Sequence, residues 1–437
     1  MAATVNGREV VLETLLLIVR DGEYSHIALK NVLDKYQYLE KKERAFITRV
    51  VDGTLEHMME IDYIINQFSK VKVNKMKPVI RMILRSSVYQ LKYMDSVPDS
   101  AVCNEAVKLA TKKGFVNLKG FVNGVLRNIS RGLSEVKYPE KETDVVNYIS
   151  VKYSLPEWIV TQWLKVYDTE TVEKMGEEFQ KENPTSIRCN LNKISKSELK
   201  NKLEAEGVTV IDEPEIPCAL YITGYDYLGK LTSFQEGDFY IQDVSSMQVS
   251  LWADPQEGDS VIDVCAAPGG KSIHMAELLR GTGHVEARDL TEYKVALIEE
   301  NIQRSGLGNI SAMQWDATVC HEASKEAADI VIADLPCSGL GVLGKKTDLK
   351  YKITEAMQKD LVAIQREILS VVHTYVKPGG KLLYSTCTIH RGENEENTKW
   401  FLENHPEFTL VREKQMIPGV DGGDGFYIAM LQKEKHE

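Results

Sequence analysis

Residues Val261–Ser272 read VIDVCAAPGGKS, an apolar run that ends in a tight turn containing Gly269 and Gly270. The run is typical of a buried strand, and the following GKSIHMAELLR has the apolar spacing of a helix. The turn is not a phosphate-binding loop, because Cys265 stands where that pattern requires a glycine. The dinucleotide pattern G-x-G-x-x-G is absent as well. The stretch therefore predicts a strand and a helix joined by a turn whose backbone a ligand can approach.

The same alternation continues along the chain. Strand-like runs GHVEARDL, ISAMQWD, ADIVIADLP and GKLLYSTCT follow, and helical patterns such as TEYKVALIEENIQRSG lie between them. A long helix is expected from about Glu355 to Val376, and GFYIAMLQK fits an added strand. Alternating strands and helices predict a mostly parallel, doubly wound sheet that binds ligands at the carboxyl ends of its strands. We expect this Rossmann-like α/β domain to span residues 241–437.

The earlier part of the chain has other patterns. Residues 1–140 read as an all-α domain, with apolar residues three and four positions apart, as in Ile80-Ile83-Leu84-Val88-Leu91. Residues 141–240 mix a strand-like TSIRCNLNK, a serine-capped helix KSELKNKLEAEGV and a second strand, VTVI. This pattern predicts a small α+β module, with strand–helix–strand units of the RNA-recognition kind among its options. The fold class is thus multidomain, since 437 residues exceed what one hydrophobic core holds.

Composition indicates an ordinary soluble protein, with 43% hydrophobic and 27% charged residues. The seven cysteines are odd in number and form no Cys-x-x-Cys pair, which favours a reducing cytoplasm and predicts no metal site. The apolar run Val10–Val19 is interrupted by Glu13 and reads as an amphipathic helix, not a signal peptide. No apolar segment is long enough to span a membrane. We expect a cytoplasmic monomer without a membrane partner.

The net charge of −11 is unevenly distributed. Residues 1–140 carry 22 Lys and Arg against 16 Asp and Glu, and within them Lys70–Arg131 holds 13 basic and 3 acidic residues. A basic segment in an acidic protein is typical of a surface that binds a polyanion. A solvated helix surface explains it equally well at this point.

Three acids close consecutive predicted strands. Asp289 follows Gly270 by nineteen residues, a place from which a carboxylate can accept hydrogen bonds from both ribose hydroxyls of a nucleoside. Asp316 could accept from an adenine amino group, and Asp334 ends the next strand. Each acid alone fits a turn or a helix cap. Together, beside a glycine turn, they favour a nucleoside cofactor that needs no phosphate contacts, and S-adenosyl-L-methionine fits.

Two cysteines also end strand-like runs, Cys337 in ADLPCSG and Cys387 in YSTCT. A lone cysteine usually acts as a small hydrophobe. Methylation of a pyrimidine at carbon 5, however, requires a nucleophile such as a thiolate to add at carbon 6 first. A carboxylic acid near ring nitrogen 3 would stabilise the adduct, and a second thiol, or a water it positions, could help to remove the carbon-5 proton. The two cysteines and Asp334 supply these groups.

The chain resembles the Sun-type (NOL/NOP/Sun) family of RNA 5-methylcytosine methyltransferases over about residues 145–433. The motifs that carry the resemblance are DVCAAPGGKS, DLPCSGLG, YSTCT, ENEEN (Glu393–Asn397), DGFYIA (Asp424–Ala429) and the preceding EGDFYIQDVSS (Glu236–Ser246). In the helical part, DSAVCNEAVKLA and FVNGVLRN are similar to the NusB-type RNA-binding fold. The chain departs from the family pattern at Leu335, where alanine is usual, and at Gly344–Asp348, where Arg-Arg-x-Pro-Asp is favoured.

The resemblance implies roles for these residues. Cys387 would be the nucleophile, Cys337 would assist product release, and Asp334 would serve the cytosine while lying against the cofactor. The S-adenosyl-L-methionine loop would comprise Cys265, Ala266, Ala267, Pro268, Gly269, Gly270 and Lys271, with Asp289, Asp316 and Asp334 as further contacts. The implied partner is an unstacked or single-stranded cytosine of 16S ribosomal RNA in the small subunit.

Several alternatives stay open at the level of sequence. The substrate could be another RNA, either tRNA or large-subunit rRNA. A DNA cytosine methyltransferase would use a Pro-Cys nucleophile and needs no Thr-Cys partner, so the second cysteine counts against it. A catalytically silent RNA-binding assembly factor is disfavoured because both cysteines and all three acids are present.

Overall fold

The computed structural model describes residues 5–435 and divides the chain into two compact units. The helical unit comprises the residues up to Lys181 together with Leu343–Lys352, and the sheet unit comprises Glu182–Val342 and the residues from Ile353 onward. The helices within residues 145–179 therefore belong to the helical unit, whereas the strands of the expected 141–240 module belong to the sheet unit. None of the helices in the described part is long and apolar enough to cross a membrane.

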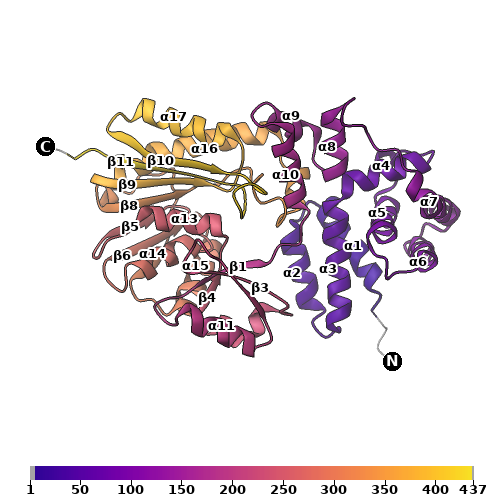
Figure 1. The fold of residues 1–437 in the computed structure, drawn as a ribbon, viewed down its shortest axis with the longest axis horizontal. Coiled ribbons are helices and arrows are strands. Elements are labelled where there is room, and N and C mark those ends of the chain that lie inside the picture. Colours follow the sequence, from indigo (N-terminus) through magenta and orange to yellow (C-terminus); the bar gives the residue numbers. More distant parts are fainter. Residues whose placement is uncertain (1–4, 436–437) are drawn as a thin grey trace. The chain divides into compact units, whose positions relative to one another are not determined.

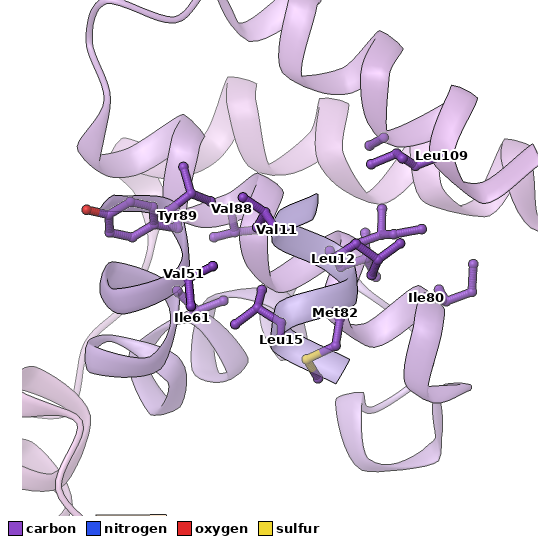
Figure 2. Packing of buried hydrophobic residues seen from close by; sticks show 14 of the residues in the cluster. Val11, Leu12, Leu15, Val51, Ile61, Ile80, Met82, Val88, Tyr89 and Leu109 are labelled. Carbon is purple, nitrogen blue, oxygen red and sulfur yellow. The ribbon is translucent and has the colours of Figure 1, made fainter. Parts of the chain in front are cut away.

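The helical unit confirms the all-α prediction. Its helices are α1 (Gly7–Val19), α2 (Ser25–Lys35), α3 (Lys41–Glu56), α4 (Met58–Phe68), α5 (Pro78–Tyr93), α6 (Asp99–Lys112), α7 (Lys119–Gly132), α8 (Val145–Tyr153), α9 (Glu157–Leu164) and α10 (Thr169–Phe179). Pro78 occupies the first position of α5, where its missing N–H costs nothing. Figure 2 shows apolar side chains of α1, such as Leu12 and Leu15, packed among those of α5, such as Val88. Helix α5 therefore forms the centre of this core.

A segment from the second half of the sequence, Leu343–Lys352, completes the helical unit; we call it the strap. The Asp348 carboxylate accepts hydrogen bonds from Ser25 N (3.1 Å) and Ser25 Oγ (2.6 Å). Lys350 Nζ donates to the Glu56 carbonyl (2.9 Å), and the Tyr351 hydroxyl donates to the Leu55 carbonyl (2.9 Å). These carbonyls lie in the last turn of α3, where the regular i to i+4 hydrogen bonds of the helix end. The strap therefore caps α3 from a distance of almost three hundred residues in sequence.

The sheet unit begins with a small antiparallel sheet of order β2-β3-β1-β4. Its elements follow a β-α-β-β-α-β sequence: β1 (Thr185–Cys189), α11 (Lys196–Ala205), β2 (Thr209–Asp212), β3 (Ala219–Thr223), α12 (Thr232–Gln235) and β4 (Phe239–Ile241). Ser195 and Glu198 form the capping box that begins α11. Leu199 and Leu203 of α11 pack against this sheet. The predicted α+β module is therefore confirmed as a ferredoxin-like arrangement.

The main sheet has seven strands in the order β10-β11-β9-β8-β5-β6-β7. They are β5 (Ser260–Asp263), β6 (His284–Asp289), β7 (Ile310–Gln314), β8 (Ala328–Asp334), β9 (Val376–Thr386), β10 (Phe408–Met416) and β11 (Phe426–Lys433). Among these seven strands only β11 runs antiparallel to its neighbours, β9 and β10, and the other pairs are parallel, so the prediction of a mostly parallel sheet is confirmed. The expected long helix ends at Val372, and a 3-10 turn separates it from β9.

Helices cover both faces of this sheet (Figure 1). On one face lie α13 (Val244–Ala253), α14 (Gly270–Leu278) and α15 (Glu292–Ser305); on the other lie α16 (Glu355–Val372) and α17 (Glu395–Asn404). Adjacent residues of one strand face opposite layers: Val261 packs with the first group of helices and Ile262 with the second. This alternation buries the parallel strands from both sides, as a doubly wound fold requires.

The strand order reverses next to β5. From β5 the chain builds outward through β6 and β7, then returns to add β8 and β9 on the other side. Ligands of doubly wound sheets bind at such a switch point, beyond the carboxyl ends of the strands. Asp263, Asp289 and Asp334 are the last residues of β5, β6 and β8. The topology therefore brings three carboxylates to one edge of the sheet.

Candidate active site

The loop between β5 and α14 contains the predicted cofactor residues 265–271. Gly269 has φ +104°, a conformation that strains any side chain, and it directly precedes α14. Asp263 supports this loop from within the core, since it accepts hydrogen bonds from Ser272 Oγ (2.6 Å) and Cys265 N (3.4 Å). Burial raises the pKa of Asp263 to about 7. Sequence reasoning missed this residue, although its place at the end of a strand matches that of Asp289.

The predicted acids Asp289 and Asp316 lie in different surroundings. Asp289 is buried against the loop, where its carboxylate accepts from Ala267 N (3.0 Å) and pairs with Lys294 Nζ (2.9 Å). Asp316 is exposed, and its carboxylate accepts hydrogen bonds from both the backbone N–H and the hydroxyl of Thr318. The structure thus places Asp289 beside the glycine turn, while Asp316 caps a turn just beyond β7.

Lys271 and Asp334 form an ion pair at the carboxyl end of β8. Lys271 Nζ lies 2.7 Å from Asp334 Oδ2, and Ser385 Oγ donates to Asp334 Oδ1 at 2.7 Å. Burial disfavours the ammonium, but the charge and hydrogen bond of Asp334 outweigh it and raise the pKa of Lys271, with a further contribution from Cys387. Lys271 is therefore a cation near the Cys387 thiol. Sequence reasoning assigned Lys271 only to the cofactor loop and gave Ser385 no role.

The two cysteines meet at the ends of β8 and β9. Their Sγ atoms lie 3.4 Å apart, and both side chains are half-buried. Strands β8 and β9 pair in parallel, and this pairing sets Asp334 beside Ser385. Each cysteine comes just after the end of its strand, so both cysteines lie at the same edge of the sheet. The hydrogen bond to Cys387 and burial raise the pKa of the Cys337 thiol well above its ordinary value. Cys337 is therefore held as a protonated thiol.

The ENEEN motif holds the two cysteine loops in place. The Glu393 carboxylate is fully buried and accepts hydrogen bonds from Ser338 N (2.8 Å) and Gln365 Nε2 (3.0 Å). The Ser338 hydroxyl bonds both to Glu393 and to the Thr388 hydroxyl (2.7 Å). Asn394 donates to the Thr388 carbonyl (3.0 Å). One motif thus fixes the residues that immediately follow Cys337 and Cys387.

The DGFYIA motif closes the other side of the Pro-Cys loop. Gly425 N donates to the Gly341 carbonyl at 2.9 Å, and a Cβ placed on Gly341 would lie only 1.8 Å from the Gly425 carbonyl oxygen. Glycine is needed at position 341 because two backbones touch there. Leu335, the departure from the family's alanine, is buried in the core between the sheet and α16.

This doubly wound fold, with its glycine turn, strand-end acids and buried support beneath the loop, defines a class I S-adenosyl-L-methionine-dependent methyltransferase. The residues fit that cofactor, since the tight turn at Gly269 joins β5 to α14 without a phosphate cradle and Asp289 offers a carboxylate beside it. The chain belongs to the RsmB/F family of ribosomal RNA methyltransferases, and the following comparisons show this membership.

Three family models match in succession. They are described as the NusB family (residues 5–131), the RsmF/B-like ferredoxin-like domain (155–225) and the 16S rRNA methyltransferase RsmB/F (250–432). Probable ribosomal RNA small subunit methyltransferase B of Bacillus subtilis is 36% identical over 445 residues, with 98% of each chain covered. The protein of the same name from Synechocystis is 30% identical over 449 residues, covering 98% of this chain and all of that one.

Two solved structures share this fold. The crystal structure of PH0851 superposes with a TM-score of 0.82 at 26% identity, covering 98% of this chain and 99% of that one. NSun6 from Pyrococcus horikoshii, solved with SFG, has a TM-score of 0.58 at 23% identity and covers 63% of this chain. The second likeness concerns the fold alone.

Proposed function

We propose that this protein methylates carbon 5 of a cytosine in 16S rRNA through a covalent Cys387–cytosine adduct. One observation carries the proposal: two thiols 3.4 Å apart stand at the strand ends, beside the Lys271–Asp334 pair. A single thiol would suffice for a packing role, whereas two thiols with an ion pair match the needs of pyrimidine methylation.

Several residues of the chain have separate roles in the proposed reaction. The Lys271 ammonium stabilises the Cys387 thiolate, which adds to carbon 6 of the cytosine and pushes electron density toward ring nitrogen 3 and carbon 5. Asp334, bridged to Lys271, lies where the pair can supply a hydrogen bond or proton to the electron-rich ring. Bound S-adenosyl-L-methionine supplies an electrophilic methyl group.

The adduct must then be resolved. The proton on carbon 5 leaves to a base, and its bonding electrons restore the 5,6 double bond as the Cys387–carbon 6 bond breaks. We propose that this base is a water held beside Cys337, or Cys337 itself after it has passed its own proton to water, since its sulfur lies next to that of Cys387. The neighbouring cation supports the division of roles, since Lys271 lies close to Cys387, and this favours attack by Cys387 over the Pro-Cys mechanism of DNA enzymes.

The RNA surface that we propose is a subset of the basic segment. Five of its cations are occupied by carboxylates: Arg85, Lys92, Lys108, Lys112 and Lys113. Lys70, Lys72, Lys75 and Lys77, between α4 and α5, are exposed. Gly132 at the end of α7 lies against the ring of Phe68, so Arg131 also lies near the end of α4. We propose that these cations bind RNA phosphates, in a cytoplasm reducing enough to keep the seven cysteines as thiols.

Bisulfite sequencing of all ribosomal RNA from a strain lacking this protein tests the proposal. One 16S cytosine that resists conversion in the parent should become convertible, and the wild-type gene, but not Cys387→Ser, should restore resistance. A lost site in tRNA or 23S rRNA would identify a different RNA substrate. An unchanged set of protected cytosines would overturn the reaction itself.

A further inference from the structure

We propose that Cys337 and Cys387 are a redox modification site, at which a peroxide joins the two thiols in a disulfide and reversibly stops methylation. Formation of this disulfide depends only on the geometry of the pair. Its effect on turnover rests on the proposed function, in which Cys387 is the nucleophile.

The backbone holds the two cysteines together, independently of their side-chain rotamers. Leu335 N donates to the Ser385 carbonyl at 3.1 Å, and Gly341 N donates to the Cys387 carbonyl at 3.0 Å. A third bond joins the residues that directly follow the cysteines, since the Ser338 hydroxyl lies 2.7 Å from the Thr388 hydroxyl. Three hydrogen bonds thus join the two segments that carry the cysteines. A disulfide requires an S–S distance of about 2.05 Å, so the 3.4 Å gap must shorten by only about 1.4 Å.

The chemistry balances with hydrogen peroxide as the oxidant. The Cys387 thiolate attacks one peroxide oxygen, the O–O bond breaks, and a sulfenic acid forms while the hydroxide takes up a proton as water. The Cys337 sulfur then attacks the Cys387 sulfur, its thiol proton joins the departing hydroxide as a second water, and the S–S bond forms. Two thiols lose two electrons in total, and one peroxide molecule gains them. A thiol reductant reverses the reaction by exchange.

A second neighbouring pair provides an internal comparison. Cys189 N donates to the Cys218 carbonyl at 2.7 Å, so these residues also lie side by side. Both are buried in the core, and burial raises the pKa of Cys189 to about 12, which leaves almost no thiolate. Cys337 and Cys387 are instead half-buried at the edge where substrates enter, and a cation lies close to Cys387. Oxidation should therefore select the active-site pair.

The disulfide would leave the Asp289 side of the cofactor site unchanged. The Asp289 carboxylate is held by Ala267 N and Leu290 N, neither of which belongs to the cysteine segments, so we expect S-adenosyl-L-methionine to bind the oxidised protein. Attack on cytosine, by contrast, needs the Cys387 thiolate and becomes impossible. Loss of methylation with retained cofactor binding is the signature that separates this modification from general oxidative damage.

The test treats the full-length protein with graded hydrogen peroxide and maps its peptides without reduction. We expect a cross-linked species joining the Cys337 and Cys387 peptides, lighter by two hydrogen atoms than the sum of the free peptides. Methylation of 16S rRNA should fall in proportion to this species and return after dithiothreitol, while calorimetry shows unchanged cofactor affinity. The half-buried Cys320 provides the matched control, since Cys320→Ser should behave like the wild type.

Cys337→Ser supplies the opposite control. It retains the Cys387 thiol but has no resolving sulfur, so peroxide should drive Cys387 to sulfinic acid, which dithiothreitol cannot reverse. If the wild-type protein forms no such cross-link and its cysteines are over-oxidised at equal peroxide, the proposal is wrong. If the cross-link forms but the reduced protein methylates no cytosine, the modification site stands and the proposed function fails.

Discussion

The thiols of Cys387 and Cys337 lie in contact, yet they have different neighbours. The Lys271 ammonium is close to Cys387, whereas Cys337 has the Cys387 sulfur and the Glu393 carboxylate beside it. A nearby cation favours a thiolate and a nearby anion disfavours it, and this supports our proposal that Cys387 attacks and Cys337 assists. The two thiols therefore differ in their charged neighbours, which the cysteine motifs alone do not reveal.

Exchanging each cysteine should separate these roles. Cys387→Ser should abolish both turnover and any covalent RNA adduct, because a serine hydroxyl is far less acidic than a thiol. Cys337→Ser should still attack and methylate, then stall, so that a protein–RNA species survives denaturing electrophoresis. Labelled 16S rRNA and S-adenosyl-L-methionine are the reagents. A trapped species with Cys387→Ser instead would reverse the assignment.

Asp289 provides a second test at the scale of one residue. Removing a charged hydrogen-bond acceptor typically costs about 1.5–3 kcal/mol, so Asp289→Ala should weaken S-adenosyl-L-methionine binding at least about tenfold in calorimetry. Asp289→Asn keeps an acceptor for Ala267 N but loses the charge, and an intermediate affinity is expected. Asp212→Ala removes an exposed acid of β2 and should change nothing. Unaltered affinity in a folded Asp289→Ala protein would remove Asp289 from the site.

At the scale of elements, the sequence predicts the strands and helices whose own residues have a clear apolar pattern. Strands β5 and β8 and the end of β9 are apolar runs buried on both faces, and their acids and cysteines fall where strands end. Strand β10 escapes prediction because it lies at the sheet edge with most of its residues exposed, so no apolar alternation marks it. The roles of Glu393 and Ser385 could not be predicted from the sequence for another reason, because their partners lie about fifty residues away along the chain.

The strap is the clearest example of structure that no local pattern encodes. Asp348 bonds to Ser25 across 323 positions, whereas the sequence alone indicates Gly344–Asp348 only as an altered substrate-binding run. In the structure this run begins the strap, so its departure from Arg-Arg-x-Pro-Asp occurs in a segment that docks on the helical unit. Thr347, which stands in place of the proline, is buried in that packing surface, whereas Lys345, which stands in place of the second arginine, is exposed.

Lys350 makes the strap sensitive to pH. Burial lowers the pKa of Lys350 to about 7 from the ordinary 10.5, although Glu56 opposes the shift. Between these values the folded protein holds fewer protons than the unfolded chain, so the free energy of unfolding should rise with pH from about 7 to 10. The gain is fully lost below the folded pKa and amounts to at most about 1.4 kcal/mol per pH unit.

Lys350→Met provides the measurement. The methionine keeps an apolar side chain of similar length but does not titrate, so the pH dependence of its urea unfolding should be flatter than that of the wild type between pH 7 and 9. Lys345→Met, an exposed position of the same strap, is the matched control and should retain the wild-type slope. Parallel curves for the wild type and Lys350→Met would show that Lys350 keeps its ordinary pKa.

At the scale of the whole molecule, charge and connectivity decide how RNA binding can be tested. Deleting residues 1–140 removes the basic segment, but it also removes Ser25 and Glu56, the partners of the strap. The strap follows the Pro-Cys loop directly in sequence, so weaker RNA binding or activity in such a fragment would have two explanations. Substitution of exposed charges in the full chain avoids this ambiguity.

The cations between α4 and α5 are suited to that test. A variant with Lys70, Lys72, Lys75 and Lys77 all changed to Gln should bind 16S rRNA more weakly, and its dependence on salt should be less steep. For every phosphate that the protein no longer neutralises, the slope of log K against log salt should become shallower by about 0.7–0.9, because fewer counterions are released. Fluorescence anisotropy over a range of potassium chloride concentrations measures this slope.

The control carries the same change in net charge at another place in the helical unit. Lys30, Lys35, Lys41 and Lys42 are exposed on α2 and α3, outside the basic segment. Their change to Gln should leave the slope near that of the wild type, since weaker long-range attraction alone leaves every bound phosphate neutralised. Cofactor affinity should be equal in both variants. If both variants flatten the slope equally, RNA responds only to net charge, and Lys70–Arg131 is a solvated helix surface.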